Sequence, residues 1–122
     1  MDKRSNIVKA GDVIGVSVKN RMDENLGEIT DIVLDKFTGQ TCYVLLSFGG
    51  IMGIGEKVLA IPWKSLHHSE SEDCFLLNRT KESLKLAPTF NKDFKPENAD
   101  WGVVDVYYRD DILWLIVSEK NV

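Results

Sequence analysis

Short stretches in which apolar and polar residues alternate dominate most of the chain. Residues 13–19 place Ile14, Val16 and Val18 on one side, which is the period-two pattern of a half-buried strand. Similar runs recur further along the chain, at 26–34, 41–48, 57–63 and 66–77, and a shorter one at 82–86. Closely spaced strands separated by turns predict an all-β barrel or sandwich. Residues 1–12 carry no such pattern and are expected to form a loosely held leader.

The run at 26–34 does not keep its apolar residues on one face. Leu26 and Ile32 have one parity along the strand, whereas Ile29 and Val33 have the other. A strand that changes faces in this way is expected to be bulged or strongly coiled, as the closure of a barrel requires. The pattern therefore predicts a small coiled antiparallel β-barrel.

Glycine, proline and acidic residues mark the connections between these runs. Residues 35–40 predict a hairpin turn in which Gly39 adopts a positive φ. Pro62 cannot donate a hydrogen bond to a sheet, so we expect it at a strand end or at a sheet edge. Residues 66–77 read as one more hairpin, with the acidic segment 69–73 at its tip.

The pattern changes after residue 87. Pro96 is suited to the start of a helix, and Trp101, Val104 and Tyr108 then recur at the spacing of one face of a short amphipathic helix. We therefore divide the chain into a barrel domain with a short leader, 1–87, and a C-terminal extension, 88–122, that packs on the barrel or on a partner chain.

Six consecutive apolar residues occupy positions 112–117 near the C-terminus. A segment of this kind must be covered, either by the barrel as an added strand or by another chain. The two alternatives carry equal weight on the sequence alone. A second apolar set lies within the glycine-rich loop 49–55, which either folds over the mouth of the barrel or contacts a partner.

Charge and composition narrow the classes of partner. The chain has 122 residues, 43% of them hydrophobic, and a formal net charge of −4. An acidic balance with scattered basic residues argues against direct binding of nucleic acid. No stretch reaches the about 18 to 20 apolar residues that span a bilayer, and no secretory signal follows the N-terminal charges. We expect a cytoplasmic protein without membrane insertion.

The two cysteines, Cys42 and Cys74, both lie in strand-like apolar runs. Free thiols buried in the core are the favoured interpretation, and a disulfide between them is the alternative.

Three groups of residues invite a chemical interpretation, and none supports one. The glycines at 49–55 match neither dinucleotide nor nucleotide-phosphate motifs. His67 and His68 are adjacent on a strand and point to opposite faces, so they do not readily share a metal ion. Asp31 and Asp35 lie about 13 Å apart on an extended strand and more simply serve turns or backbone donors. We predict no catalytic residue, no cofactor and no metal site.

Several short motifs follow one another in an order and spacing typical of one known family. They are Leu26-Gly27-x-Ile29-x-Asp31, the Thr38-Gly39 turn, Tyr43-Val44-Leu45, Gly49-Gly50 and Ile61-Pro62-Trp63. Together they resemble a PRC-barrel domain over approximately residues 9–87. The tail, with Phe90, Trp101 and Tyr107-Tyr108, is similar to the extension that follows the barrel in many stand-alone bacterial members.

The resemblance implies a β-barrel without enzymatic activity of its own. In this family, one barrel forms the cytoplasmic part of the photosynthetic reaction-centre H subunit. Another belongs to the ribosome maturation factor and binds a small-subunit ribosomal protein, and archaeal members act as cell-division adaptors. This chain has neither the membrane helix of the first nor the N-terminal partner domain of the second, so neither specific function is transferred to it.

The predicted function is thus a non-enzymatic protein–protein assembly module that self-associates as a homodimer or larger homo-oligomer. The candidate contact residues come from the glycine-rich loop and the terminal apolar segment: Ile51, Met52, Ile54, Trp114, Leu115 and Ile116. The alternative hypothesis is a ribosome- or RNA-processing-associated factor that binds a ribosomal protein. A minor third hypothesis is a sensor that binds a small molecule in the barrel interior or a metal at His67 and His68.

Overall fold

The computed structural model describes residue 4 and residues 6–48 and 57–109. Seven strands form one sheet in the order β5-β6-β1-β2-β3-β4-β7. Their bounds are β1 Ser17–Lys19, β2 Asn25–Leu34, β3 Thr41–Ser47, β4 Lys57–Pro62, β5 His67–Ser69, β6 Cys74–Leu76 and β7 Thr89–Asn91. The short helices are α1 Ala10–Val13 and α2 Lys81–Leu84, and the 3-10 turns are η1 Trp63–Ser65 and η2 Pro96–Asn98. A further helical segment covers 101–109.

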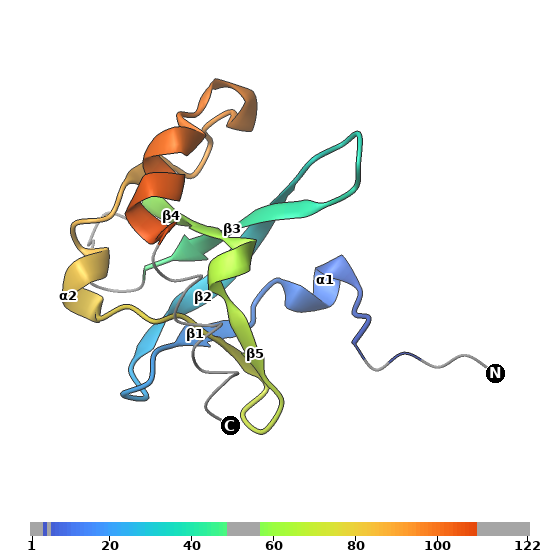
Figure 1. The fold of residues 1–122 in the computed structure, drawn as a ribbon, viewed down its shortest axis with the longest axis vertical. Coiled ribbons are helices and arrows are strands. Elements are labelled where there is room, and N and C mark those ends of the chain that lie inside the picture. Colours follow the sequence, from blue (N-terminus) through green and yellow to red (C-terminus); the bar gives the residue numbers. More distant parts are fainter. Residues whose placement is uncertain (1–3, 5, 49–56, 110–122) are drawn as a thin grey trace.

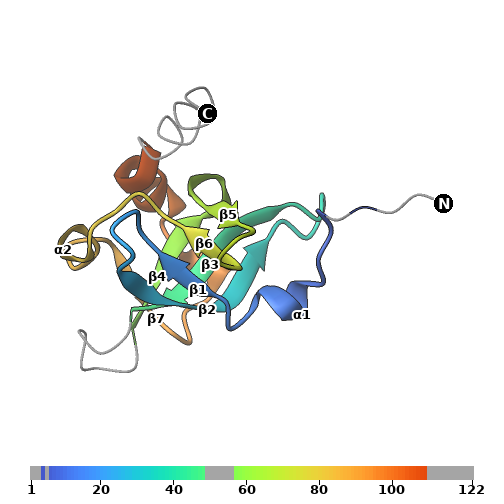
Figure 2. The same ribbon diagram turned by 90° about the horizontal axis from the view of Figure 1, so that it is seen from below.

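The structure is mainly β and its sheet is coiled, as expected, but the sheet is not a closed antiparallel barrel (Figures 1 and 2). Within the described residues, β5 and β7 are the edge strands and do not pair with each other. The β1–β6 pair is parallel, because β6 enters the sheet beside β1 after the β5–β6 hairpin has reversed the chain. The prediction of a small coiled antiparallel β-barrel is therefore confirmed in part: the coiled β-sheet is present, but in these residues it does not close and one pair of strands is parallel.

Strand β2 carries the irregularities that its mixed parity predicted. Its register with β3 shifts twice, between Ile29 and Asp31 and between Val33 and Leu34. Gly27 in the same strand has φ +141°, and a Cβ placed there would stand 1.9 Å from the carbonyl oxygen of Ser47. Only glycine allows β2 and β3 to approach this closely.

Two of the predicted strands differ from the structure. The run at 13–19 is a strand only from Ser17 onward, and the end of the leader forms α1. Gly15, with φ +93°, turns the chain between these two elements. Residues 82–86 do not form a strand, because Thr80 caps α2 by accepting a hydrogen bond from the Ser83 amide at 3.0 Å.

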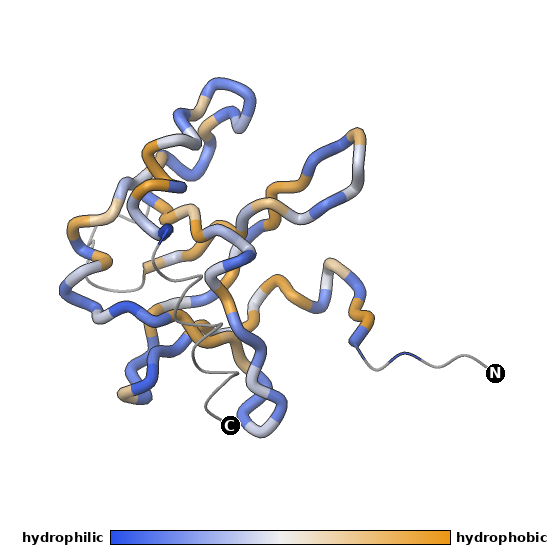
Figure 3. The backbone as a smooth tube through the Cα atoms, viewed as in Figure 1, coloured by the Kyte–Doolittle hydropathy of each residue, from blue (hydrophilic) through white to orange (hydrophobic). Residues whose placement is uncertain are grey.

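The predicted turns and the C-terminal helix are confirmed. Gly39 has φ +79° in the β2–β3 turn, Pro62 ends β4, and residues 66–77 contain the β5–β6 hairpin. Its turn is the hydrophilic loop near the bottom of Figure 3. Pro96 begins η2 rather than the longer helix, which starts at residue 101.

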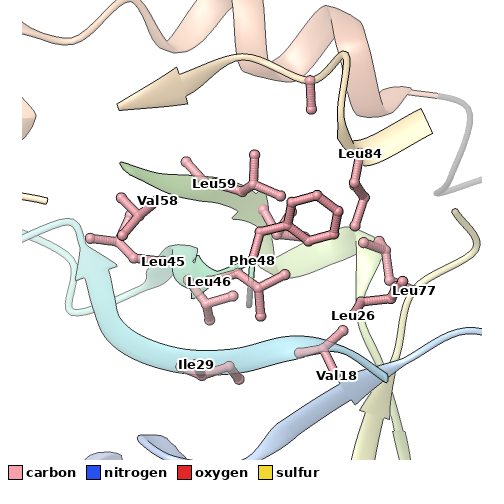
Figure 4. Packing of buried hydrophobic residues seen from close by; sticks show 14 of the residues in the cluster. Val18, Leu26, Ile29, Leu45, Leu46, Phe48, Val58, Leu59, Leu77 and Leu84 are labelled. Atoms are coloured by element: carbon pink, nitrogen blue, oxygen red, sulfur yellow. The ribbon is translucent and has the colours of Figure 1, made fainter. Parts of the chain in front are cut away.

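One hydrophobic core joins the sheet to the C-terminal residues. Its strand residues converge in Figure 4, where Leu77 and Leu84 close one side. The extension adds to this core, since Val104 and Tyr108 on the helical segment are 0% and 1% exposed. The extension also supplies β7, which pairs with β4.

Candidate functional site

A cavity of about 750 Å³ lies between the start of β3, the junction of β4 with η1, and helix 101–109. The strands contribute Cys42 and Tyr43, η1 contributes Lys64 and Ser65, and the helix contributes Asp105. Binding pockets for small molecules and short segments have volumes of roughly 300–1,000 Å³. The cavity is therefore of a size to receive a ligand, and its wall mixes aromatic, polar and charged side chains.

Tyr43 and Asp105 form one wall of the cavity. The Tyr43 hydroxyl donates a hydrogen bond to the Asp105 carboxylate at 2.6 Å. Burial, together with the hydrogen bond and the negative charge of Asp105, raises the pKa of Tyr43 well above its ordinary value near 10. The phenol is consequently held protonated as a donor, and the carboxylate already has a partner.

The same wall is stiffened by aromatic packing. The Tyr43 ring stacks on Trp101, with ring centroids 4.2 Å apart and planes at 18°. Phe90 and Phe94 pack around Trp101, and the indole nitrogen donates to the Pro96 carbonyl at 2.9 Å. Trp101 therefore serves packing, because it contacts rings from both the sheet and the tail.

Arg79 holds the helix against the rest of the domain. Its guanidinium lies over the rings of Tyr107 and Tyr108, at 4.7 and 5.2 Å from their centroids, and donates to the Tyr107 carbonyl. The Tyr107 hydroxyl in turn donates to the carbonyl of Ser83 in α2. The helix that forms one wall of the cavity is therefore held in place, because it is bonded to α2 and to the segment before α2.

The floor and the rim of the cavity differ in polarity. Ser65 is 0% exposed, and its Oγ has no hydrogen-bond partner among the described residues. Lys64 and Arg109 are exposed, and neither forms an ion pair with another described residue. The lining of the site thus contains a buried hydroxyl and two exposed cationic side chains.

Both cysteines are free thiols, so the alternative of a disulfide is wrong. Cys74 is buried, and burial followed by the charge of Glu72 raises its pKa. Cys42 is only half-buried and lines the cavity, with Sγ 3.6 Å from the carbonyl oxygen of Gln40. The prediction of a core position therefore holds fully for Cys74 alone.

The candidate contact residues from the sequence lie outside the described residues. This applies to the whole set: Ile51, Met52, Ile54, Trp114, Leu115 and Ile116. The other residues singled out have structural roles, since the Asp31 and Asp35 carboxylates accept hydrogen bonds from backbone amides. His67 and His68 lie on β5, and no group of three or more metal-ligating residues occurs among the described residues.

Sequence reasoning did not find the cavity residues. Cys42 and Asp105 are far apart in sequence, and neither belongs to a recognisable motif. One signal was available, since Pro62-Trp63 ends a strand and is followed by the polar pair Lys64-Ser65. Loops that follow the strands of a rigid sheet often carry the polar side chains that bind ligands.

Comparison with known proteins places the chain in a family. The model of the PRC-barrel domain matches residues 5–84, which include the strands β1 to β6 and α2. No curated protein matches the chain. No helix in the described part of the chain is long and apolar enough to cross a membrane. The chain belongs to the PRC-barrel family, whose domains mediate protein interactions.

Proposed function

We propose that this protein is a non-enzymatic assembly module that associates with other protein chains, including copies of itself. The observation that best supports the proposal is an apolar pair on the outer side of helix 101–109. Val103 and Val106 are 49% and 64% exposed, whereas Val104 and Tyr108 on the opposite side are buried. The helix thus has two apolar sides, and among the described residues one of them is buried while the other is exposed.

The valine pair fits a protein contact because of its position. Residues three apart on a helix are neighbours on its surface, so Val103 and Val106 form one continuous apolar strip. Leu86, which is 81% exposed, follows α2, and Tyr107 ties the helix to α2. Apolar surface held on a fixed element is typical of protein interfaces.

The non-enzymatic part of the proposal rests on the cavity groups. The raised pKa of Tyr43 keeps its hydroxyl protonated at neutral pH, so this hydroxyl does not act as a general base, and it donates its proton to a hydrogen bond with the Asp105 carboxylate. The described residues that line the cavity do not include a histidine. These groups suit binding rather than turnover.

Light scattering on the full chain tests self-association. We expect a mass of at least twice the 13.8 kDa of one chain. We expect Val106→Glu to lower the measured mass toward that of a single chain, because it places a charge in the interface. Met22→Glu is the matched control, since Met22 in the β1–β2 turn is also 64% exposed. A single-chain mass for the parent protein, or an equal shift with both variants, would contradict the proposal.

A further inference from the structure

The described residues that line the cavity beside helix 101–109 carry a net positive charge, opposite in sign to that of the whole protein. The formal net charge of the chain is −4, yet Lys64 and Arg109 stand at the rim and form no ion pair with a described residue. Asp105 is the acidic residue among the described residues of the lining, and the Tyr43 hydroxyl occupies its carboxylate at 2.6 Å. An anionic group that enters the cavity therefore meets a net positive charge, which comes from two cationic side chains and one carboxylate.

One residue in the lining of the cavity, Ser65, has a buried polar atom that lacks a partner among the described residues. Ser65 is 0% exposed and lines the cavity, and its Oγ makes no hydrogen bond with any described residue. Buried polar groups are almost always hydrogen-bonded, so an exception requires an explanation. The amide or carbonyl group of a bound peptide would provide the partner that Ser65 lacks.

The walls of the cavity add an apolar component. The half-buried Trp63 ring and the buried Pro62 line one side, and the Tyr43 ring, fixed by its stacking on Trp101, lines another. Surfaces of this kind bind apolar or aromatic side chains without requiring a particular hydrogen-bond pattern. A volume of about 750 Å³ accommodates a few residues of a peptide but not a folded element.

We propose that this cavity binds a short acidic segment of a partner protein, in which a carboxylate lies next to an aromatic or apolar side chain. The carboxylate pairs with Lys64 and Arg109, the apolar side chain packs on Trp63, and the peptide backbone hydrogen-bonds Ser65 Oγ. The inference rests on the proposed function as an interaction module, and it adds a site and the chemistry of its partner.

A peptide titration of the ¹⁵N-labelled full chain tests the site. The probe is acetyl-Phe-Glu-Phe amide, and the control is acetyl-Phe-Gln-Phe amide, which has the same shape without the charge. We expect the Glu peptide to shift the backbone amide signals of Cys42, Lys64 and Ser65. We expect the Gln peptide to bind about fivefold more weakly, as for an exposed ion pair. Equal binding of both peptides, or shifts confined to other residues, would overturn the proposal.

A carboxylate next to an aromatic ring could come from a partner protein or from a small carboxylic acid, and free 3-phenylpropionate distinguishes the two. It carries the carboxylate and the ring but no peptide backbone, so weaker binding than that of the Glu peptide supports a partner segment. Binding as tight as that of the peptide would assign the cavity to a small carboxylic acid and would refute the peptide proposal.

Two variants test the roles of the cavity residues. Lys64→Glu should abolish the preference for the Glu peptide, whereas Lys36→Glu in the β2–β3 turn should leave it unchanged, since both lysines are exposed and only Lys64 lines the cavity. Ser65→Ala should weaken peptide binding severalfold while leaving Tm unchanged or raised, because it removes a buried unpartnered hydroxyl. A lowered Tm with unchanged binding would show that Ser65 is structural.

The readout is independent of the oligomeric mass. Peptide binding in a protein that has the mass of a single chain would refute self-association and leave the cavity assignment standing. The reverse outcome, a response of the mass without any peptide binding, would refute the cavity assignment alone.

Discussion

The two ends of strand β3 have different surroundings, although both lie between the same neighbouring strands. At one end, Leu46 is 0% exposed and pairs with Ile29 on β2 and Leu59 on β4. At the other end, Cys42 and Tyr43 face a cavity that is also lined by the buried Ser65 and by the basic side chains of Lys64 and Arg109. The first end is covered by other core residues, whereas at the second end Tyr43 stacks on Trp101 at the start of helix 101–109.

The two ends of β3 are suited to different roles, one to stability and the other to binding. A densely packed region tolerates almost no change in volume, because any added or removed atom is felt by its neighbours. A region that retains polar groups and free volume can change its side chains at little cost to the fold. We therefore expect substitutions at the packed end to affect folding, and substitutions at the cavity end to affect mainly ligand binding.

The largest effect is expected for Gly27→Ala at the packed end. The new Cβ would overlap the Ser47 carbonyl oxygen at 1.9 Å, on a backbone with φ +141°, so we expect a loss of about 3 kcal/mol in the free energy of unfolding. Urea denaturation measures this loss. Gly39→Ala is the control, because Gly39 has φ +79° with nothing within 4 Å of the added atom. Equal losses would show that the close approach of β2 and β3 contributes nothing.

An intermediate effect is expected for Tyr43→Phe at the cavity end. The substitution removes the hydrogen bond to Asp105 but retains the ring that stacks on Trp101, so the expected loss is about 1 kcal/mol. The same denaturation experiment at pH 7 measures it. A loss as large as that of Gly27→Ala would contradict the distinction between the two ends.

The pH dependence of this pair follows from the raised pKa of Tyr43. The folded state retains the phenolic proton to a higher pH than the unfolded chain, in which tyrosine titrates near 10. The stabilisation is therefore complete below pH about 10 and is lost as the pH rises through the folded pKa. Tyr43→Phe should flatten the alkaline decline in unfolding free energy, and parallel declines in the two proteins would refute this origin.

The smallest effect concerns thiol reactivity and leaves folding unchanged. Cys42 is half-exposed at the cavity, whereas Cys74 is 2% exposed and has a raised pKa. Iodoacetamide should therefore label Cys42 first in the native protein, because the accessible thiolate is the reactive form. Mass spectrometry of digested samples locates the label, with Cys42→Ser as the control. Faster labelling of Cys74 would mean that the packed region opens more readily than the cavity.

The strands could be predicted because their signals are local. The mixed parity of 26–34 anticipated the register shifts of β2, and Gly39 anticipated the positive φ of the β2–β3 turn. The exceptions also have local causes: Gly15 turns the chain before β1, and the Thr80 cap produces a helix where the apolar pattern indicated a strand.

The cavity could not be predicted because its residues meet only through tertiary packing. Nothing in the sequence links Tyr43 with Asp105 or with Trp101, and nothing in the sequence shows that Ser65 is buried. The parallel pairing of β1 with β6 escaped prediction for the same reason. Alternation along a strand identifies which side chains face inward, but it does not identify the neighbouring strand.

The parallel β1–β6 pair also bears on how this chain is expected to fold as it is synthesised. Strand β1 is made early, yet its partner β6 follows only after β2, β3, β4 and β5. The β2–β3 hairpin is a local contact. The β1–β6 pair closes a long loop, so the loss of chain entropy that this closure requires comes late in folding. The free edge of β1 therefore remains unprotected until residues 74–76 have been added, and during this interval the growing chain is most exposed to mispairing with other strands.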